Sequence, residues 1–178
     1  MKRFRVREET GPARTRGRWR KAAFLATALS VLTALTAAPA TVANADTTPR
    51  TTILRSWTQG QCLDSNYVGN VYELNCNGGN YQNWNIEAFG QAYLLQDAQT
   101  GLCLENDSGW PNVFTAPCFA TGEQQWLISE FTDGLGHDVM NIEQSLGNGC
   151  LDANVLGGLP YVNSNCYSGG YQDWKPGL

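Results

Sequence analysis

Basic residues are scarce after residue 45 of this 178-residue chain. Residues 46–178 contain only Arg50, Arg55 and Lys175 against 14 acidic residues, a net charge of −11. An acidic surface of this kind repels phosphate backbones and anionic lipid headgroups, so nucleic acid and acidic membranes are poor candidate partners. The segment also lacks a helical apolar period, and its 17 glycines and 14 asparagines favour turns. We therefore predict a single all-β, loop-rich domain.

Metal-binding patterns are missing as well. The chain has one histidine, His137, and none of its six cysteines forms a C-x-x-C pair. Zinc sites are built from such pairs or from several histidines, so we predict no metal site, and no cofactor is expected.

Residues 1–45 differ from the rest of the chain. A basic stretch ends at Lys21, an uncharged segment runs from Ala22 to Ala45, and Ala43-Asn44-Ala45 is a small-x-small pattern. These features in this order predict a secretory signal peptide over residues 1–45, and hence an exported, bacterial-type protein that is extracellular after cleavage before Asp46. An uncleaved transmembrane anchor is the alternative, because the uncharged run is long enough to span a bilayer. Cleavage would leave no membrane-spanning segment.

Three similar units follow one another along the remaining chain. Each unit has a Cys-Leu-acid triplet, a second cysteine 14 to 16 positions after the first, and a Gln-x-Trp motif. The triplets begin at Cys62, Cys103 and Cys150, the second cysteines are Cys76, Cys118 and Cys166, and the motifs end at Trp84, Trp126 and Trp174. Export to an oxidising compartment indicates disulfides. Equivalent units favour the pairs Cys62–Cys76, Cys103–Cys118 and Cys150–Cys166.

Short strand-like segments lie between these motifs. Residues 52–57, 93–95 and 139–142 open the three units, and residues 84–87 and 126–129 alternate apolar and polar side chains. We expect about four short strands in each unit, closed into a barrel-like body without long open edges. The expected domain covers residues 52–178 after a short leader at 46–51, with units at roughly 52–90, 91–136 and 137–178.

The threefold pattern of triplet, paired cysteine and Gln-x-Trp resembles the ricin B-type lectin family over roughly residues 52–174. The resemblance implies a β-trefoil fold, with the three motif tryptophans in the core and the motif glutamines tying backbone together near them. It also implies a non-catalytic, carbohydrate-binding function with up to three shallow pockets, one in each unit. In that family the acid of the triplet binds sugar hydroxyls, an aromatic residue two positions before the second cysteine stacks on the sugar ring, and an asparagine often precedes the motif glutamine.

The family's pocket pattern is only partly present in this sequence. Its acids are Asp64, Glu105 and Asp152, but its stacking positions are Leu74, Ala116 and Ser164, and Tyr81, Glu123 and Tyr171 stand before the motif glutamines. A sugar site needs a flat aromatic surface and a fixed polar group. Units 1 and 3 contain other aromatics that could supply the surface: Tyr67, Tyr72 and Tyr81 around Asp64, and Tyr161, Tyr167 and Tyr171 around Asp152.

The resulting candidate residues for carbohydrate binding belong to units 1 and 3. They are Asp64, Tyr72, Tyr81, Gln82, Asp152, Tyr161, Tyr171 and Gln172. We expect a neutral glycan or polysaccharide as the ligand, because the surface is acidic. We also expect both aspartates to be surface carboxylates that contribute little to folding.

Two other classes of function compete with this prediction. A catalytic triad would depend on His137, which lies in a glycine-rich segment, residues 133–138, typical of a turn. A carboxylate pair for glycoside hydrolysis stays open from sequence, but three equivalent units favour several small sites over one deep cleft, so we predict no enzyme. The main alternative is a secreted β-trefoil that binds a protein partner or serves a structural role without binding sugar, since the stacking aromatics are missing.

Overall fold

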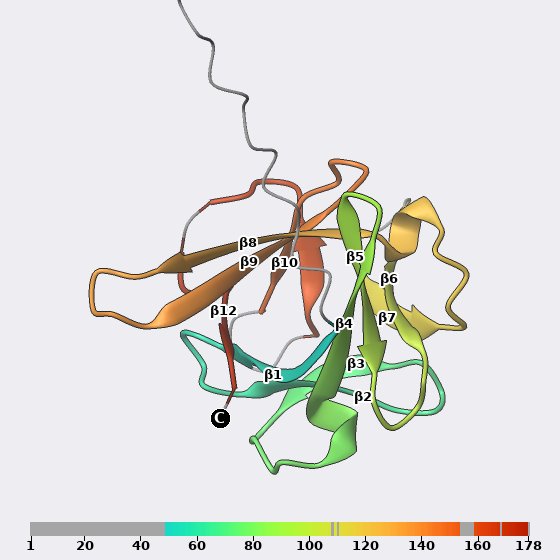
Figure 1. Ribbon diagram of the computed structural model, residues 1–178, viewed down its shortest axis with the longest axis horizontal. Helices are drawn as coiled ribbons and strands as arrows, with labels where there is room; N and C mark the ends of the chain where they lie inside the picture. Colours follow the sequence, from blue (N-terminus) through green and yellow to red (C-terminus); the bar gives the residue numbers. More distant parts are fainter. Residues whose placement is uncertain (1–48, 108, 110, 154–158, 168, 178) are drawn as a thin grey trace, which may run out of the picture. The chain divides into compact units, whose positions relative to one another are not determined.

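The computed structural model describes residues 49–107, 109, 111–153, 159–167 and 169–177. The predicted signal peptide lies outside these residues, as does the start of the predicted leader. No helix in the described part of the chain is long and apolar enough to cross a membrane. The described residues form strands and two short 3₁₀ turns, η1 (Asn80–Gln82) and η2 (Gly122–Gln124) (Figure 1).

Twelve strands are present in this part of the chain, four in each unit. Unit 1 contains β1 (Arg50–Ser56), β2 (Cys62–Ser65), β3 (Val71–Leu74) and β4 (Asn83–Phe89). Unit 2 contains β5 (Ala92–Asp97), β6 (Cys103–Asn106), β7 (Val113–Ala116) and β8 (Trp126–Thr132). Unit 3 contains β9 (Asp138–Gln144), β10 (Cys150–Asp152), β11 (Tyr161–Asn163) and β12 (Asp173–Pro176). The strands predicted at the start of the units lie in β1, β5 and β9.

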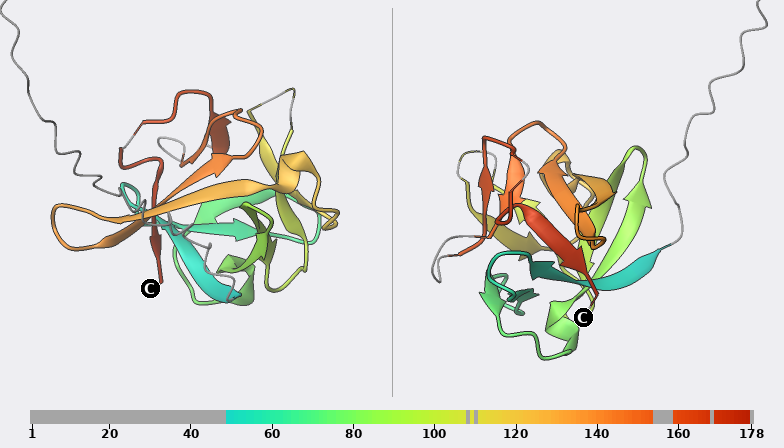
Figure 2. Two further views of the ribbon diagram at one scale, coloured as in Figure 1. Left: turned by 45° about the horizontal axis from the view of Figure 1, so that its top comes forward. Right: turned by 90° about the vertical axis from the view of Figure 1, so that its left-hand side faces the viewer.

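The outer strands of the units close a six-stranded ring. Each unit's first strand pairs with its fourth, as β1–β4, β5–β8 and β9–β12, and the units are joined by β4–β5, β8–β9 and β12–β1. The middle strands form one hairpin in each unit, β2–β3, β6–β7 and β10–β11. A closed ring with three hairpins leaves no long open edge and is the expected β-trefoil arrangement. The β8–β9 hairpin is long and extends beyond the ring (Figure 2).

Three tryptophans form the centre of the core. Trp84, Trp126 and Trp174 are fully buried. Each indole Nε1 donates a hydrogen bond to the carbonyl oxygen of the leucine in its own Cys-Leu-acid triplet, at 3.1, 3.0 and 3.0 Å. A buried indole N–H needs such a partner, so the triplet and the Gln-x-Trp motif stabilise each other. The predicted core role of these tryptophans is confirmed.

Each unit carries one disulfide bond. The pairs are Cys62–Cys76, Cys103–Cys118 and Cys150–Cys166, with Cα–Cα distances of 5.1, 5.1 and 5.2 Å. These are the predicted pairs. Restricting a loop of this length in the unfolded chain contributes roughly 3 kcal/mol per bond in the entropic model.

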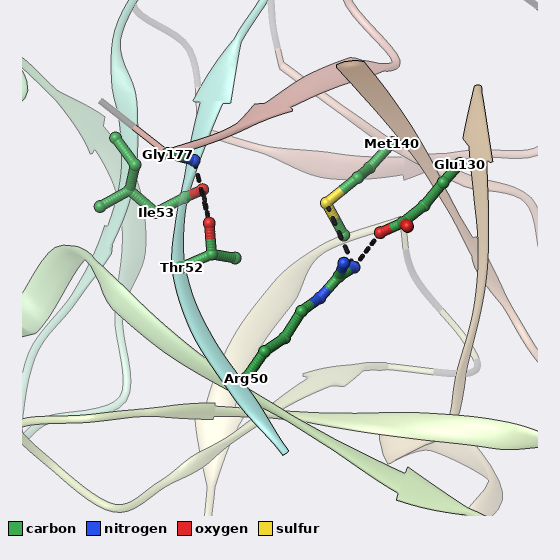
Figure 3. Close-up of polar contacts among 6 residues, drawn as sticks. All are labelled: Arg50, Thr52, Ile53, Glu130, Met140 and Gly177. Carbon is green, nitrogen blue, oxygen red and sulfur yellow. Dashed lines mark hydrogen bonds and ion pairs between the residues drawn. The ribbon is translucent and has the colours of Figure 1, made fainter. Parts of the chain in front are cut away.

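The two ends of the described chain are held together beside the β8–β9 hairpin (Figure 3). The backbone N–H of Gly177 donates to Thr52 Oγ1 at 2.9 Å, and the Arg50 guanidinium forms an ion pair with Glu130. Arg50 Nη2 also lies 3.8 Å from Met140 Sδ. These contacts supplement the β1–β12 pairing that closes the ring.

Candidate functional site

In each hairpin the acid of the triplet lies directly opposite an aromatic residue. The register pairs Asp64 with Tyr72. The equivalent pairs are Glu105 with Phe114 and Asp152 with Tyr161. Residues directly opposite in an antiparallel pair place their side chains on the same face, where they interact. Units 1 and 3 therefore combine a carboxylate with a phenol, and unit 2 combines a carboxylate with a phenyl ring.

The same register corrects one position inferred from spacing. The first cysteines of the units lie opposite Leu74, Ala116 and Asn163. Counting back two positions from the second cysteine places the unit 3 stacking position at Ser164. This is wrong by one residue, because the segment from Asn163 to Cys166 is one residue longer than the equivalent segments of units 1 and 2. The structure thus adds Asn163 to the candidate site. Only the hairpin register could identify it.

Asp152 is the centre of a polar network in unit 3. Its Oδ2 accepts hydrogen bonds from Asn163 Nδ2 at 3.0 Å, from Gln172 Nε2 at 3.1 Å and from the Tyr167 hydroxyl at 3.3 Å. The same Asn163 amide lies 3.2 Å from the Tyr161 hydroxyl, which also hydrogen-bonds to Asp152. Predicted residues Asp152, Tyr161 and Gln172 are therefore in one cluster.

The environment of the unit 3 cluster raises the pKa of two tyrosines. Burial, and next the charge of Asp152, raise the pKa of both Tyr161 and Tyr167. Tyr167 is 40% exposed, so part of its side chain faces solvent while its hydroxyl donates to Asp152. Tyr171, the third predicted aromatic, is half-buried, and its carbonyl oxygen accepts the Ala153 N–H at 2.7 Å.

The motif glutamines hold the loop after each second cysteine. Gln172 Oε1 accepts the Tyr167 N–H at 2.8 Å, and its amide also donates to the Asn165 carbonyl at 3.0 Å. Gln82 makes the same pair of contacts with Asn77 N and Asn75 O, at 2.9 and 3.2 Å. The predicted backbone-tying role of the glutamines is confirmed, and each also hydrogen-bonds to the acid of its own triplet.

Unit 1 repeats this arrangement with fewer polar contacts. Asp64 hydrogen-bonds to Gln82 and Tyr72, and burial is the main cause that raises its pKa. The predicted residue Tyr81 lies beside Tyr67, with ring centroids 5.9 Å apart in an edge-to-face arrangement. Tyr67 is 63% exposed, so the two rings offer an aromatic surface next to the hairpin.

The expectation that the two aspartates are surface carboxylates is wrong. Asp64 and Asp152 are each only 3% exposed. The aromatic residue opposite and the motif glutamine cover each carboxylate, and hydrogen bonds offset the cost of burying it. The tyrosine and asparagine groups around the carboxylates, rather than the carboxylates themselves, are therefore the more exposed part of each cluster.

Unit 2 differs in its chemistry. Glu105 Oε2 accepts the Gln124 amide at 2.7 Å, but the residue opposite is Phe114, which has no hydroxyl. The Glu105 carboxylate therefore has no tyrosine hydroxyl opposite it in this hairpin. Unit 2 thus lacks the pairing of a carboxylate with a phenol that units 1 and 3 share.

His137 lies in the turn of the β8–β9 hairpin, as its sequence context predicted. Its Nδ1 is 3.0 Å from Asp133 Oδ2, and its ring packs edge-on against Trp57 with centroids 5.0 Å apart. The backbone N–H of His137 is the main group that lowers the pKa of Asp133 to about 2. These contacts stabilise a surface turn.

A comparison with protein families decides the assignment of this fold and its repeated sites. The model of the ricin-type β-trefoil lectin domain matches residues 50–174. The chain belongs to the ricin-type β-trefoil lectin domain family. The members of this lectin family are carbohydrate-binding modules, which is the general function of the domain described here.

Two solved structures have the same fold. A designed three-fold symmetric protein, ThreeFoil, aligns with a TM-score of 0.62 and 20% identity over 72% of this chain and 98% of its own. A mosquitocidal holotoxin aligns with a TM-score of 0.62 and 19% identity over 73% of this chain and 17% of the toxin chain. At these identities the two structures show the fold alone.

Proposed function

We propose that the protein is a secreted, non-catalytic lectin that binds neutral glycans through the hairpins of units 1 and 3. The observation that carries this proposal is the network on Asp152 Oδ2, which holds Asn163 and Tyr167 in fixed positions at the surface. Family membership and the signal-like segment of the sequence support the binding of sugars outside the cell.

The unit 3 cluster has the two kinds of group that a sugar requires. The Tyr167 hydroxyl donates to Asp152, so its oxygen lone pairs are free to accept a hydrogen bond from a sugar hydroxyl. The exposed part of its ring offers an apolar surface to the C–H groups of the sugar. Because the partners of Tyr167 are already fixed, a ligand meets a preorganised surface and less ordering entropy is lost on binding.

An uncharged ligand fits the charges around both hairpins. Asp64 and Asp152 are acidic, and none of the hydrogen bonds described for their clusters involves lysine or arginine. Residues 46–178 as a whole carry 14 acids and three basic residues. Sulfated or uronic-acid-rich glycans would be repelled by this surface.

The carboxyl group whose pKa is raised to about 7 is not accessible to a substrate. Glycoside hydrolysis needs a carboxyl of raised pKa that reaches the substrate. Burial is the main cause that raises the pKa of Glu73 to about 7, but both of its carboxylate oxygens are buried and have no hydrogen-bond partner. Glu73 therefore cannot contact a sugar at the surface.

A glycan array with residues 46–178 tests the proposal. We expect binding to neutral saccharides with a dissociation constant of about 1 mM per site, typical of a shallow site. Tyr167→Phe removes only the hydroxyl and should weaken binding to unit 3 about tenfold, while Tyr93→Phe, a half-buried tyrosine on β5, serves as the matched control. Thermal unfolding should be nearly the same for both variants. Binding that is unaffected by Tyr167→Phe and Tyr72→Phe together would contradict the assignment.

One observation favours a second function, the binding of a protein. The β8–β9 hairpin exposes Leu127, Phe131 and Leu135, at 37%, 41% and 79%. Exposed apolar side chains on a projecting hairpin are typical of interaction surfaces. If the array shows no binding at high protein concentration, this hairpin is the first surface to test for a protein partner.

A further inference from the structure

A cavity of about 400 Å³ lies where unit 2 meets unit 3. One wall is the end of β6 and the loop after it, with Asn106 and Asp107, and a second is the β9–β10 turn, with Asn148. The third wall is formed by β11 and its continuation, including Tyr161 and Ser164. Its volume is within the usual range for small-molecule sites.

Backbone contacts hold the walls of this cavity in place. The Val162 N–H donates to the Pro111 carbonyl at 2.6 Å, and Asn112 forms an isolated β-bridge with Tyr161. Gly149, at the end of the β9–β10 turn, has a φ of +132°, and a Cβ there would overlap the carbonyl oxygen of Asn163. Only glycine allows this close approach of the turn to β11. The cavity is therefore formed by the backbone rather than by side-chain positions alone.

The side chains of the cavity suit a ligand rich in hydroxyl groups. Asn106, Asn148 and Asn163 contribute amides, Asp107 a carboxylate and Tyr161 an aromatic ring. Amides and carboxylates bind hydroxyl groups well, and the ring can contact the C–H groups of a sugar. No lysine or arginine is among the lining residues, so an anionic ligand would not be neutralised there.

The cavity shares a wall with the Asp152 cluster. Asn163 Nδ2 hydrogen-bonds to Asp152 Oδ2 and to the Tyr161 hydroxyl, and both Asn163 and Tyr161 also line the cavity. Asn163 and Tyr161 are therefore the two residues that belong both to the Asp152 cluster and to the cavity.

The junction of units 1 and 2 is built differently. Its backbone contacts are similar, since Thr115 N donates to the Gly69 carbonyl at 2.8 Å and Asn70 bridges to Phe114. Tyr67, from the loop after β2, crosses this junction: its hydroxyl accepts the Gln99 amide at 3.1 Å and donates to the Gln99 carbonyl at 3.2 Å. At the junction of units 2 and 3 the contact between the corresponding loops is a pair of amides, Asn148 Nδ2 to Asn106 Oδ1 at 3.4 Å.

We propose that the cavity between units 2 and 3 is a second saccharide subsite, adjoining the Asp152 cluster at Asn163 and Tyr161, so that this protein binds an oligosaccharide chain in preference to a single sugar. The proposal rests on the proposed lectin function of unit 3. It adds Asp107 and Asn148 as residues that contact a second sugar unit and set the length of ligand recognised, while the buried Asn106 holds Asn148 in place.

Titration calorimetry with matched ligands tests this subsite. The probes are galactose, xylose and glucose, each compared with its β-1,4-linked tetramer. For the sugar that binds, we expect the tetramer to bind about tenfold more tightly than the monomer. Asn148→Ala and Asp107→Ala should each reduce this ratio towards one while leaving the affinity for the monomer within about twofold. Asn85→Ala, which also removes one side-chain hydrogen bond but lies on β4, should keep the full ratio.

Amide NMR gives a second readout that does not depend on the affinity ratio. The side-chain amide signals of Asn106 and Asn148 should shift on addition of the tetramer and stay in place on addition of the monomer. A ratio near one in the unmodified protein, with monomer binding still weakened about tenfold in Tyr167→Phe, would overturn the subsite and leave the lectin function standing. A ratio unchanged in both cavity variants would overturn it as well. The absence of binding to every probe would refute both proposals.

Discussion

Replacing Glu73 should remove a pH dependence of folding stability. Glu73 lies on β3 opposite the fully buried Leu63, and both of its carboxylate oxygens are buried without a hydrogen-bond partner. The equivalent positions in the other hairpins, opposite Leu104 and Leu151, hold Thr115 and Val162. Unit 1 thus places an ionisable group where the other units have a hydroxyl and an apolar side chain.

The sign of the effect follows from the two states of the chain. Burial, and next the charge of Asp152, raise the pKa of folded Glu73 from 4.5 to about 7. The unfolded chain therefore loses this proton first as pH rises, so the free energy of unfolding should fall between pH 4.5 and 7 and then level off. One pKa unit corresponds to about 1.4 kcal/mol, so a shift from 4.5 to about 7 sets an upper limit of about 3.4 kcal/mol. The side chain is only half-buried, and solvent screening reduces this to about 1–2 kcal/mol.

Urea denaturation of the oxidised protein from pH 4.5 to pH 8 measures this difference. For Glu73→Gln and for Glu73→Val, we compare the free energy of unfolding with that of the unmodified protein at the same pH. This difference should be about 1–2 kcal/mol more favourable to the variant at pH 8 than at pH 4.5. Glu87→Gln, on the exposed part of β4, is the matched control and should stay within about 0.5 kcal/mol at each pH. Asp64 and Asp173 also have a raised pKa caused mainly by burial, so only the difference between variants isolates Glu73. Parallel stability curves for Glu73→Gln and the unmodified protein would refute the reasoning.

Two further predictions concern the core and the N-terminal segment. Trp84→Ala removes a fully buried side chain and the hydrogen bond to the Leu63 carbonyl, and should cost roughly 3–5 kcal/mol by urea denaturation, with sugar binding lost only through unfolding. N-terminal sequencing of the protein recovered from culture medium should begin at Asp46 or within a few residues of it. Recovery only from the membrane fraction, with residues 22–42 intact, would instead show that the anchor alternative is right.

Much of the fold could be predicted because the sequence repeats itself. Three copies of the same triplet, cysteine pair and Gln-x-Trp motif imply three equivalent units, and equivalence then selects the disulfide pairs. Trp84, Trp126 and Trp174 were expected in the core for the same reason, and all three are fully buried. The strands at the start of each unit were also recognisable, because alternating apolar residues in short runs bounded by glycine have a strong local pattern.

The candidate site was harder to predict, because it depends on which residues lie opposite each other. Asp64 and Asp152 were identified from the triplet, but their burial was not, since covering groups come from the opposite strand and from the motif glutamine. Asn163 could not be placed by counting from Cys166, because the loop before Cys166 is one residue longer in unit 3. The extra residue changes the spacing to Cys166 but leaves Asn163 paired with Cys150 in the hairpin. Local sequence contains no measure of that shift.

The amino-acid sequence by itself determined the all-β class, the three units, the pairing of six cysteines and the acids at the centre of each hairpin. All of these depend on residue type and spacing within a unit. The tertiary structure decided which groups face a ligand, the isolation of Glu73 from hydrogen-bond partners and the cavity at the junction of units 2 and 3. These features arise where strands and loops distant in sequence meet, and the contacts between them depend on strand register and ring closure rather than on any local pattern.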